Sequence, residues 1–136
     1  MSNYITIPGF TKLTKQKMFD MAVKHIGTTG VKSVNVHGKC IYSGTGCNAA
    51  PMLREDMRQD ADAYGSWSEL VGEDMAPAHN VKFIVELQEV HDNSGKYASN
   101  LTASFRKAYL INMQALAKSH NLNSTELDAL RIKWKV

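Results

Sequence analysis

Cysteine, proline and long apolar runs are scarce in this sequence, and each scarcity excludes a class of protein. The 136 residues include two cysteines and three prolines. Two cysteines cannot build the dense disulfide framework that stabilises many small secreted domains. No apolar run approaches the roughly 20 residues of a membrane-spanning helix, so we expect no contact with a membrane. The opening residues lack a basic start followed by an apolar stretch, so no signal peptide is expected either.

An excess of charge of one sign is also missing. Sixteen basic and 13 acidic residues give a formal net charge of +3. The clearest basic cluster is Arg131, Lys133 and Lys135 at the C-terminus. Such a balance permits contact with nucleic acid or acidic proteins and does not require it. Ordinary solvated side chains are the alternative interpretation of this cluster.

The length and the hydrophobic content of 43% predict one compact domain over residues 1–136, with its core between about 13 and 134. Apolar residues recur at helical spacing over 14–27, 80–92 and 98–120, and again after Asn123 to Thr125, where Leu127, Leu130 and Trp134 share a face. In the first of these segments Thr14 can cap a helix and Gly27 or Gly30 can end it. Asn48 and a capping box at Ser66 and Glu69 predict two shorter helices, with a polar surface loop over 54–65 between them. Residues 31–44 contain two β-branched or aromatic runs around His37-Gly38, which predicts a hairpin. The expected fold class is therefore mainly α with one short β-hairpin (α+β) and about five helices.

Both cysteines flank a glycine-containing turn. Cys40 and Cys47 stand seven positions apart, unlike the closer pairs of zinc sites and of redox-active motifs. A free cysteine usually serves as a small buried apolar residue. We therefore expect two reduced, buried thiols in a reducing cytosol, and neither a metal nor a cofactor.

The turn between the cysteines superficially matches a dinucleotide-binding fingerprint. Gly44, Gly46 and Ala49 have the spacing of that motif, and glycines allow a backbone to approach phosphate closely. The parallel strand–helix–strand unit that a dinucleotide site requires is missing from residues 50–66. A smaller anion site on the same loop stays open.

A His-Asp pair, His91-Asp92, ends the segment 80–92. Metal-dependent phosphohydrolases combine such a pair with another histidine and a later aspartate. Here His25, His37 or His79 could supply the histidine, and Asp128 the aspartate. The alternative is a structural pair at a helix end. No Gly-x-Ser-x-Gly nucleophile motif occurs, and we assign no catalytic residue.

Several of these segments together resemble a known pattern. Cys40-x-Tyr42, Gly44, Cys47-x-Ala49 and a later Leu87-Gln88-x-x-His91-Asp92 are similar to motifs of a family of small uncharacterised proteins from tailed phages and some bacteria. The resemblance spans roughly residues 15–120. It implies a phage accessory protein that works in the cytoplasm of the infected host cell. It also implies that the recurring residues meet in space, as a small pocket or as part of the core, and these candidates are Cys40, Tyr42, Gly44, Gly46, Cys47, Asn48, His91 and Asp92.

Two classes of function follow as expectations. The first is a non-enzymatic binder that inhibits or redirects a host protein, or sequesters a small anionic signal, in anti-defence or host takeover. The second is a metal-dependent phosphohydrolase built on His91-Asp92. A lesser alternative is a nucleic-acid-binding protein that uses Arg131, Lys133 and Lys135.

Overall fold

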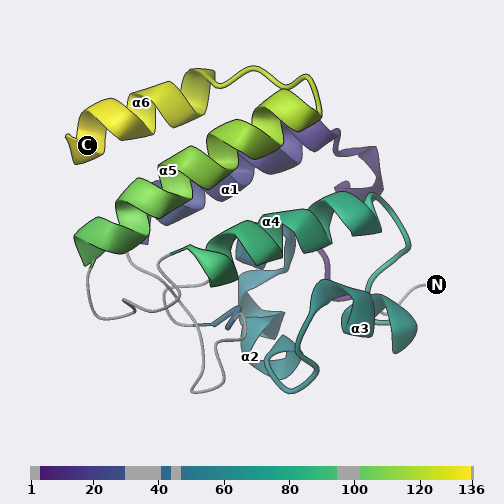
Figure 1. The fold of residues 1–136 in the computed structure, drawn as a ribbon. Helices are drawn as coiled ribbons and strands as arrows, with labels where there is room; N and C mark the ends of the chain where they lie inside the picture. Colours follow the sequence, from purple (N-terminus) through teal and green to yellow (C-terminus); the bar gives the residue numbers. More distant parts are fainter. Residues whose placement is uncertain (1–3, 30–40, 44–46, 95–101, 136) are drawn as a thin grey trace.

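A computed structural model of the protein describes residues 4–29, 41–43, 47–94 and 102–135 (Figure 1). Within these ranges the chain forms six α-helices and three short 3-10 helices. The α-helices are α1 (Lys15–Thr29), α2 (Arg58–Ala61), α3 (Trp67–Gly72), α4 (Val81–Asn93), α5 (Thr102–Ser119) and α6 (Thr125–Trp134). The 3-10 helices are η1 (Phe10–Lys12), η2 (Ala50–Met52) and η3 (Glu55–Met57).

The mainly helical class is confirmed, but the expected hairpin is not seen. Tyr42 and Ser43 lie outside any strand, and their backbone N–H groups donate to Oδ1 of Asp62 at 2.6 and 3.4 Å. A side-chain carboxylate thus accepts hydrogen bonds that a strand ladder would otherwise take. Residues 31–40 and 44 of the expected hairpin lie outside the described residues. In the described ranges, β pairing is limited to one antiparallel bridge between Thr6 and Leu53.

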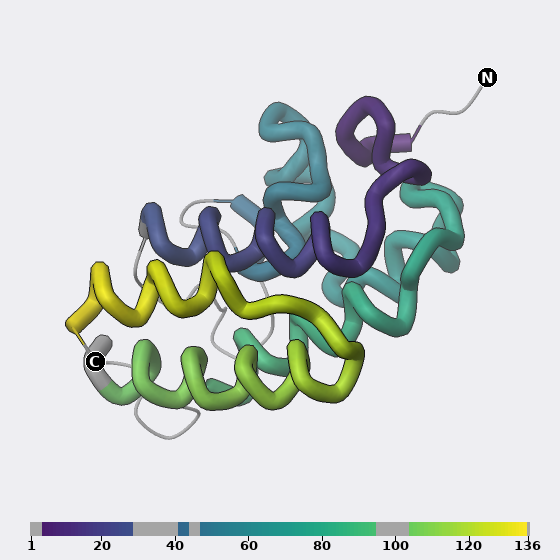
Figure 2. The backbone as a smooth tube through the Cα atoms, turned by 90° about the horizontal axis from the view of Figure 1, so that it is seen from above, coloured from purple at the N-terminus to yellow at the C-terminus, as the bar shows by residue number. Residues whose placement is uncertain are grey.

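The four long helices pack around a common core (Figure 2). α1 contacts α4 and α6, and α5 contacts the same two helices. Hydrogen bonds from Gln16 to Asn123 and from Lys133 to Gly27 show that α1 and α6 run parallel. Ser94 bonds to Asn112, whereas Glu86 meets His120, so α4 and α5 run antiparallel.

The apolar periodicity of the sequence explains these helices. Met18, Ala22 and Ile26 on α1 are fully buried, as are most of the residues that the pattern placed on the inner face of α4. Thr14 caps α1 as expected, because its Oγ1 accepts the backbone N–H of Lys17 at 3.1 Å. Of the two glycines expected to end the helix, Gly27 lies within it, and the helix ends at Thr29, directly before Gly30.

A smaller layer formed by η3, α2 and α3 lies on the other side of α4 from α5 and α6 (Figure 1). The polar loop expected over 54–65 is wrong in part, because η3 and α2 form there. Ser66 precedes α3 as expected, but its Oγ contacts Oγ of Ser68 at 3.1 Å and caps nothing, so the capping box does not form. Asn48 does not cap a helix either, since η2 begins after Ala49 and the Asn48 side chain is used elsewhere.

The last helix docks on the core. Leu127 and Leu130 are buried, and Trp134 is only 9% exposed. The Trp134 ring lies 6.0 Å from that of Tyr109 and 5.2 Å from the guanidinium carbon of Arg106. The spacing of these three apolar residues therefore identified the buried face of α6 correctly.

Replacing Trp134 with alanine should lower the free energy of unfolding by about 3 kcal/mol, because the change removes a large buried ring. Urea unfolding measures this. Ile132 on the same helix is 77% exposed and provides the control. Ile132→Ala should change stability by less than about 0.5 kcal/mol. Equal effects of the two substitutions would contradict the docking of α6.

Candidate functional site

Asn48, one of the sequence-predicted site residues, is a buried bridge between helices. It is 0% exposed. Its Nδ2 donates to the carbonyl oxygen of Leu87 on α4 at 2.8 Å, and its Oδ1 accepts from the Tyr109 hydroxyl on α5 at 2.7 Å. Both ends of the amide are therefore used in holding α4 and α5 to the segment that precedes η2.

Tyr42 belongs to a second buried set of hydrogen bonds. Its hydroxyl donates to the carbonyl of Gly65 at 2.6 Å and accepts from Nε2 of Gln88 at 2.7 Å. Oε1 of Gln88 in turn accepts the backbone N–H of Trp67, the first residue of α3, at 2.8 Å. Gln88 thus joins α4 to α3 and to Tyr42.

Burial dominates the electrostatics of both phenols. Burial raises the pKa of Tyr42 well above its ordinary value, against the opposing effect of the hydrogen bond from Gln88. The pKa of Tyr109 is raised in the same way, against the hydrogen bond to Asn48. Both groups therefore stay neutral hydrogen-bond donors, and neither is a base or nucleophile at neutral pH.

His91 and Asp92 form a pair at the end of α4. His91 is 0% exposed, and its Nδ1 lies 2.9 Å from Oδ1 of Asp92. The ring packs edge-on against Phe105, with 5.8 Å between centroids. These contacts are those of a buried structural histidine, which usually requires a polar partner.

Two of the other proposed hydrolase ligands, His79 and Asp128, do not lie beside this pair. His79 contacts the carbonyl oxygen of Leu13 at 2.7 Å, beyond the opposite end of α4. Asp128 is exposed on α6. Across the described ranges, no three His, Cys, Asp or Glu side chains come close enough to hold a metal ion. His37 lies outside these ranges.

Cys47 is fully buried, as expected, but it is not a thiol. The residue is disulfide-bonded, which makes the expectation of a reduced cysteine wrong for this position. Disulfides persist in oxidising compartments and are rare in the cytosol, so this bond lends no support to the cytoplasmic location expected from the sequence. Cys40, Gly44 and Gly46 lie outside the described residues.

Tyr42 and Asn48 each hydrogen-bond to α4, and the sequence analysis missed two of the residues that hold this buried framework. Gln88 connects Tyr42 to α3, and Asp62 accepts the backbone of Tyr42 and also bonds Ser43 Oγ. A glutamine between the apolar inner residues of a helix is a signal for such a buried bond, because a glutamine there needs partners. Asp62 offered no comparable signal. With Tyr42, Asn48 and His91 at 0% exposure, this framework is core rather than an open site.

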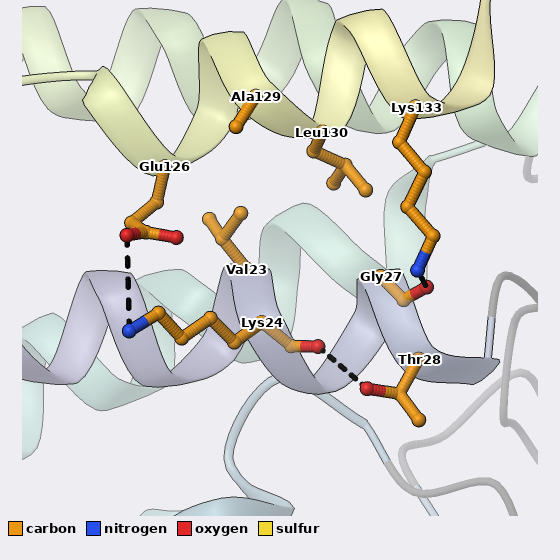
Figure 3. Close-up of a pocket in the computed structure, with 8 residues that line it drawn as sticks. All are labelled: Val23, Lys24, Gly27, Thr28, Glu126, Ala129, Leu130 and Lys133. Atoms are coloured by element: carbon orange, nitrogen blue, oxygen red, sulfur yellow. Dashed lines mark hydrogen bonds and ion pairs between the residues drawn. The ribbon is translucent and has the colours of Figure 1, made fainter.

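A shallow groove of about 300 Å³ lies between α1 and α6 (Figure 3). Val23 and Leu130 face each other across its floor, and Lys24 and Lys133 lie along its edges. Lys24 pairs with Glu126 at 3.7 Å, and Lys133 donates to the carbonyl oxygen of Gly27 at 2.8 Å.

The groove offers little to an anion. Lys133 binds the carbonyl end of α1, where a helix carries partial negative charge. A Cβ on Gly27 would come within 3.0 Å of Leu130 Cδ1, so the two helices approach closely here. Both lysines and the glycine are therefore explained by the packing of α1 against α6.

The charged exterior is divided between two sides of the molecule. α1, α5 and α6, together with Lys135, carry nine basic and three acidic residues, a formal charge of +6. Residues 54–74, which we call the acidic layer, carry two basic and seven acidic residues, a formal charge of −5. Figure 1 shows α5 and α6 on one side of α4, and α2 and α3 of the acidic layer on the other.

The predicted basic residues lie on the positive side. Arg131 and Lys133 on α6 and Lys135 just beyond it are exposed. We define the α5–α6 face by six exposed residues, namely Lys107, Ile111 and Lys118 of α5, Arg131 and Ile132 of α6, and Lys135 just after α6. Lys133 is left out because it is bonded to α1.

No protein-family model, curated protein or solved structure matches this chain. Within the residues that the structure describes, no helix is long and apolar enough to cross a membrane.

Cys47 should resist alkylation in denaturant and react fully once a reductant is added, because its sulfur is in a disulfide. Peptide mapping by mass spectrometry measures the labelled fraction at this position. Alkylation of Cys47 in freshly isolated, unreduced protein would contradict the bond.

Proposed function

We propose that this chain is a non-enzymatic binding protein, a phage accessory protein that attaches to a host protein and blocks or redirects it. The binding surface in this proposal is the α5–α6 face. The resemblance to phage accessory proteins motivates the biological setting. A setting in the host cytoplasm requires, in addition, that the fold tolerate reduction of the Cys47 disulfide.

The observation that carries the proposal is the use of the candidate polar groups within the core. The amide of Asn48 and the hydroxyl of Tyr42 have protein partners, and His91 is fully buried beside Asp92. A catalytic group has to meet its substrate at hydrogen-bond distance, which burial of this kind prevents. We therefore look for the functional surface on the exterior, where basic and acidic residues lie on opposite sides of the molecule.

Opposite charges on two sides of a small protein favour recognition of another macromolecule. Complementary potentials speed the encounter of two proteins and suppress wrong partners. The basic residues of the α5–α6 face would meet an acidic surface, and its isoleucines would supply apolar contact at the centre.

The alternatives have less support. His79 and Asp128, two ligands of the hydrolase hypothesis, do not lie beside His91-Asp92. The groove lysines that could hold a small anion have protein partners in Gly27 and Glu126. A nucleic-acid partner would use the basic side chains of the same face but would leave Ile111 and Ile132 without apolar partners.

A capture experiment from host lysate tests the proposal. The face variant Lys107→Gln/Lys118→Gln/Arg131→Gln should lose a host protein that the unchanged chain retains, because it removes three exposed charges from the proposed surface. The captured protein should also be released by salt, since screening weakens contacts between exposed charges.

The matched control is Lys12→Gln/Lys15→Gln/Lys17→Gln, which changes the net charge equally at exposed positions of η1 and the start of α1. It should retain the same host protein. If all three chains retain the host protein equally, the proposed surface is wrong. If only nucleic acid is recovered, the partner of the α5–α6 face is a nucleic acid and not a host protein.

A further inference from the structure

The large apolar side chains that are exposed in the described part of the chain lie on the two charged sides. Ile111 on α5 is 58% exposed and Ile132 on α6 is 77% exposed. Tyr64, the third of them, is 38% exposed in the acidic layer. Single exposed apolar residues are ordinary, but these three accompany the strongest separation of charge in the molecule.

The residues that define the α5–α6 face are exposed, and no described element of the chain packs over them. Lys107, Ile111 and Lys118 are spaced by four and seven residues, which places them on one side of α5. The inner side of the same helix is occupied by residues such as Tyr109 and Met113, both fully buried. An occupant of the outer side must therefore bring negative charge together with apolar surface.

The acidic layer of a second copy has this chemistry. Exposed carboxylates surround Tyr64 in the sequence, and they are Glu55, Asp56, Asp60, Glu69, Glu73 and Asp74. In the part of the chain that the structure describes, none of them forms an ion pair with a lysine or arginine. Their charge is thus available to a partner.

We propose that the α5–α6 face, when no host protein occupies it, binds the acidic layer of a second copy of this chain. The two surfaces lie on opposite sides of α4 (Figure 1), so one molecule cannot bring them together. The contact is head-to-tail rather than two-fold, because a two-fold contact would set equal charges against each other. Head-to-tail contacts leave a free surface at each end, so dimers extend into longer chains as concentration rises.

Sedimentation of the purified, oxidised protein tests this inference. The average mass should increase with protein concentration at about 20 mM salt. The increase should largely vanish at about 500 mM salt, because the screening length falls from roughly 20 Å to about 4 Å. Ile132→Ala should weaken the association at low salt by removing apolar contact.

Two complementary variants identify the surfaces. The face variant Lys107→Gln/Lys118→Gln/Arg131→Gln and the layer variant Glu55→Gln/Asp56→Asn/Glu73→Gln should each be monomeric alone. Their mixture should form a one-to-one complex that does not grow further. The intact acidic layer of the face variant can bind the intact α5–α6 face of the layer variant, and the two altered surfaces cannot bind. The Lys12→Gln/Lys15→Gln/Lys17→Gln control, with the same net charge as the face variant, should associate like the unchanged chain.

Other outcomes would overturn the inference. A chain that stays monomeric at low salt has no such contact. An association that persists in the face variant uses another surface, and a closed dimer points to a two-fold interface. Association seen only in preparations that contain nucleic acid would assign the α5–α6 face to that polymer. Circular dichroism melts establish that each variant is folded before it is compared.

Discussion

The amide of Asn48 is the interaction on which the arrangement of the core depends. It lies in an irregular segment, Cys47–Leu53, in which all residues but Pro51 are buried. Irregular backbone in a core needs polar partners, because buried N–H and C=O groups that lack them are costly. Turns within the segment and bonds from Ile7 and Arg58 supply these partners. The Asn48 side chain instead joins the segment to α4 and α5, and Gln88 joins α4 to α3. Two side-chain amides thus align helices that no strand connects within the described residues.

The helices were predictable because their apolar spacing reports burial directly. Phe83, Ile84 and Leu87 repeat on one side of α4, and Trp134 completes the same pattern on α6. The strand expected at Tyr42 and Ser43 was not, since β-branched and aromatic residues mark burial as well as strands. Tyr42 is buried as a core residue whose backbone binds Asp62, twenty positions away, and local sequence does not encode such a contact.

Of the candidate site, the structure describes Tyr42, Cys47, Asn48, His91 and Asp92. Tyr42 and Asn48 both contact α4, as the pattern implied. Polar residues form the same sequence motif whether they line a ligand cavity or form hydrogen bonds within a core. In both cases they connect segments that are distant in the sequence. Only burial distinguishes the two, and it shows a core. The division of charge escaped the sequence reading because it arises when α1, α5 and α6 assemble on one side, with residues 54–74 on the other.

The central claim is that Asn48 is a structural bridge and not a ligand-binding group. Urea unfolding of Asn48→Leu, Tyr109→Phe and the double variant tests it most directly. Asn48→Leu keeps the branched outline of the side chain and should cost about 1 to 3 kcal/mol, because it leaves the buried Tyr109 hydroxyl without its acceptor. Adding Tyr109→Phe should then cost little more, since that hydroxyl has already lost its partner. An Asn48→Leu variant as stable as the unchanged chain, or strictly additive effects, would contradict the account.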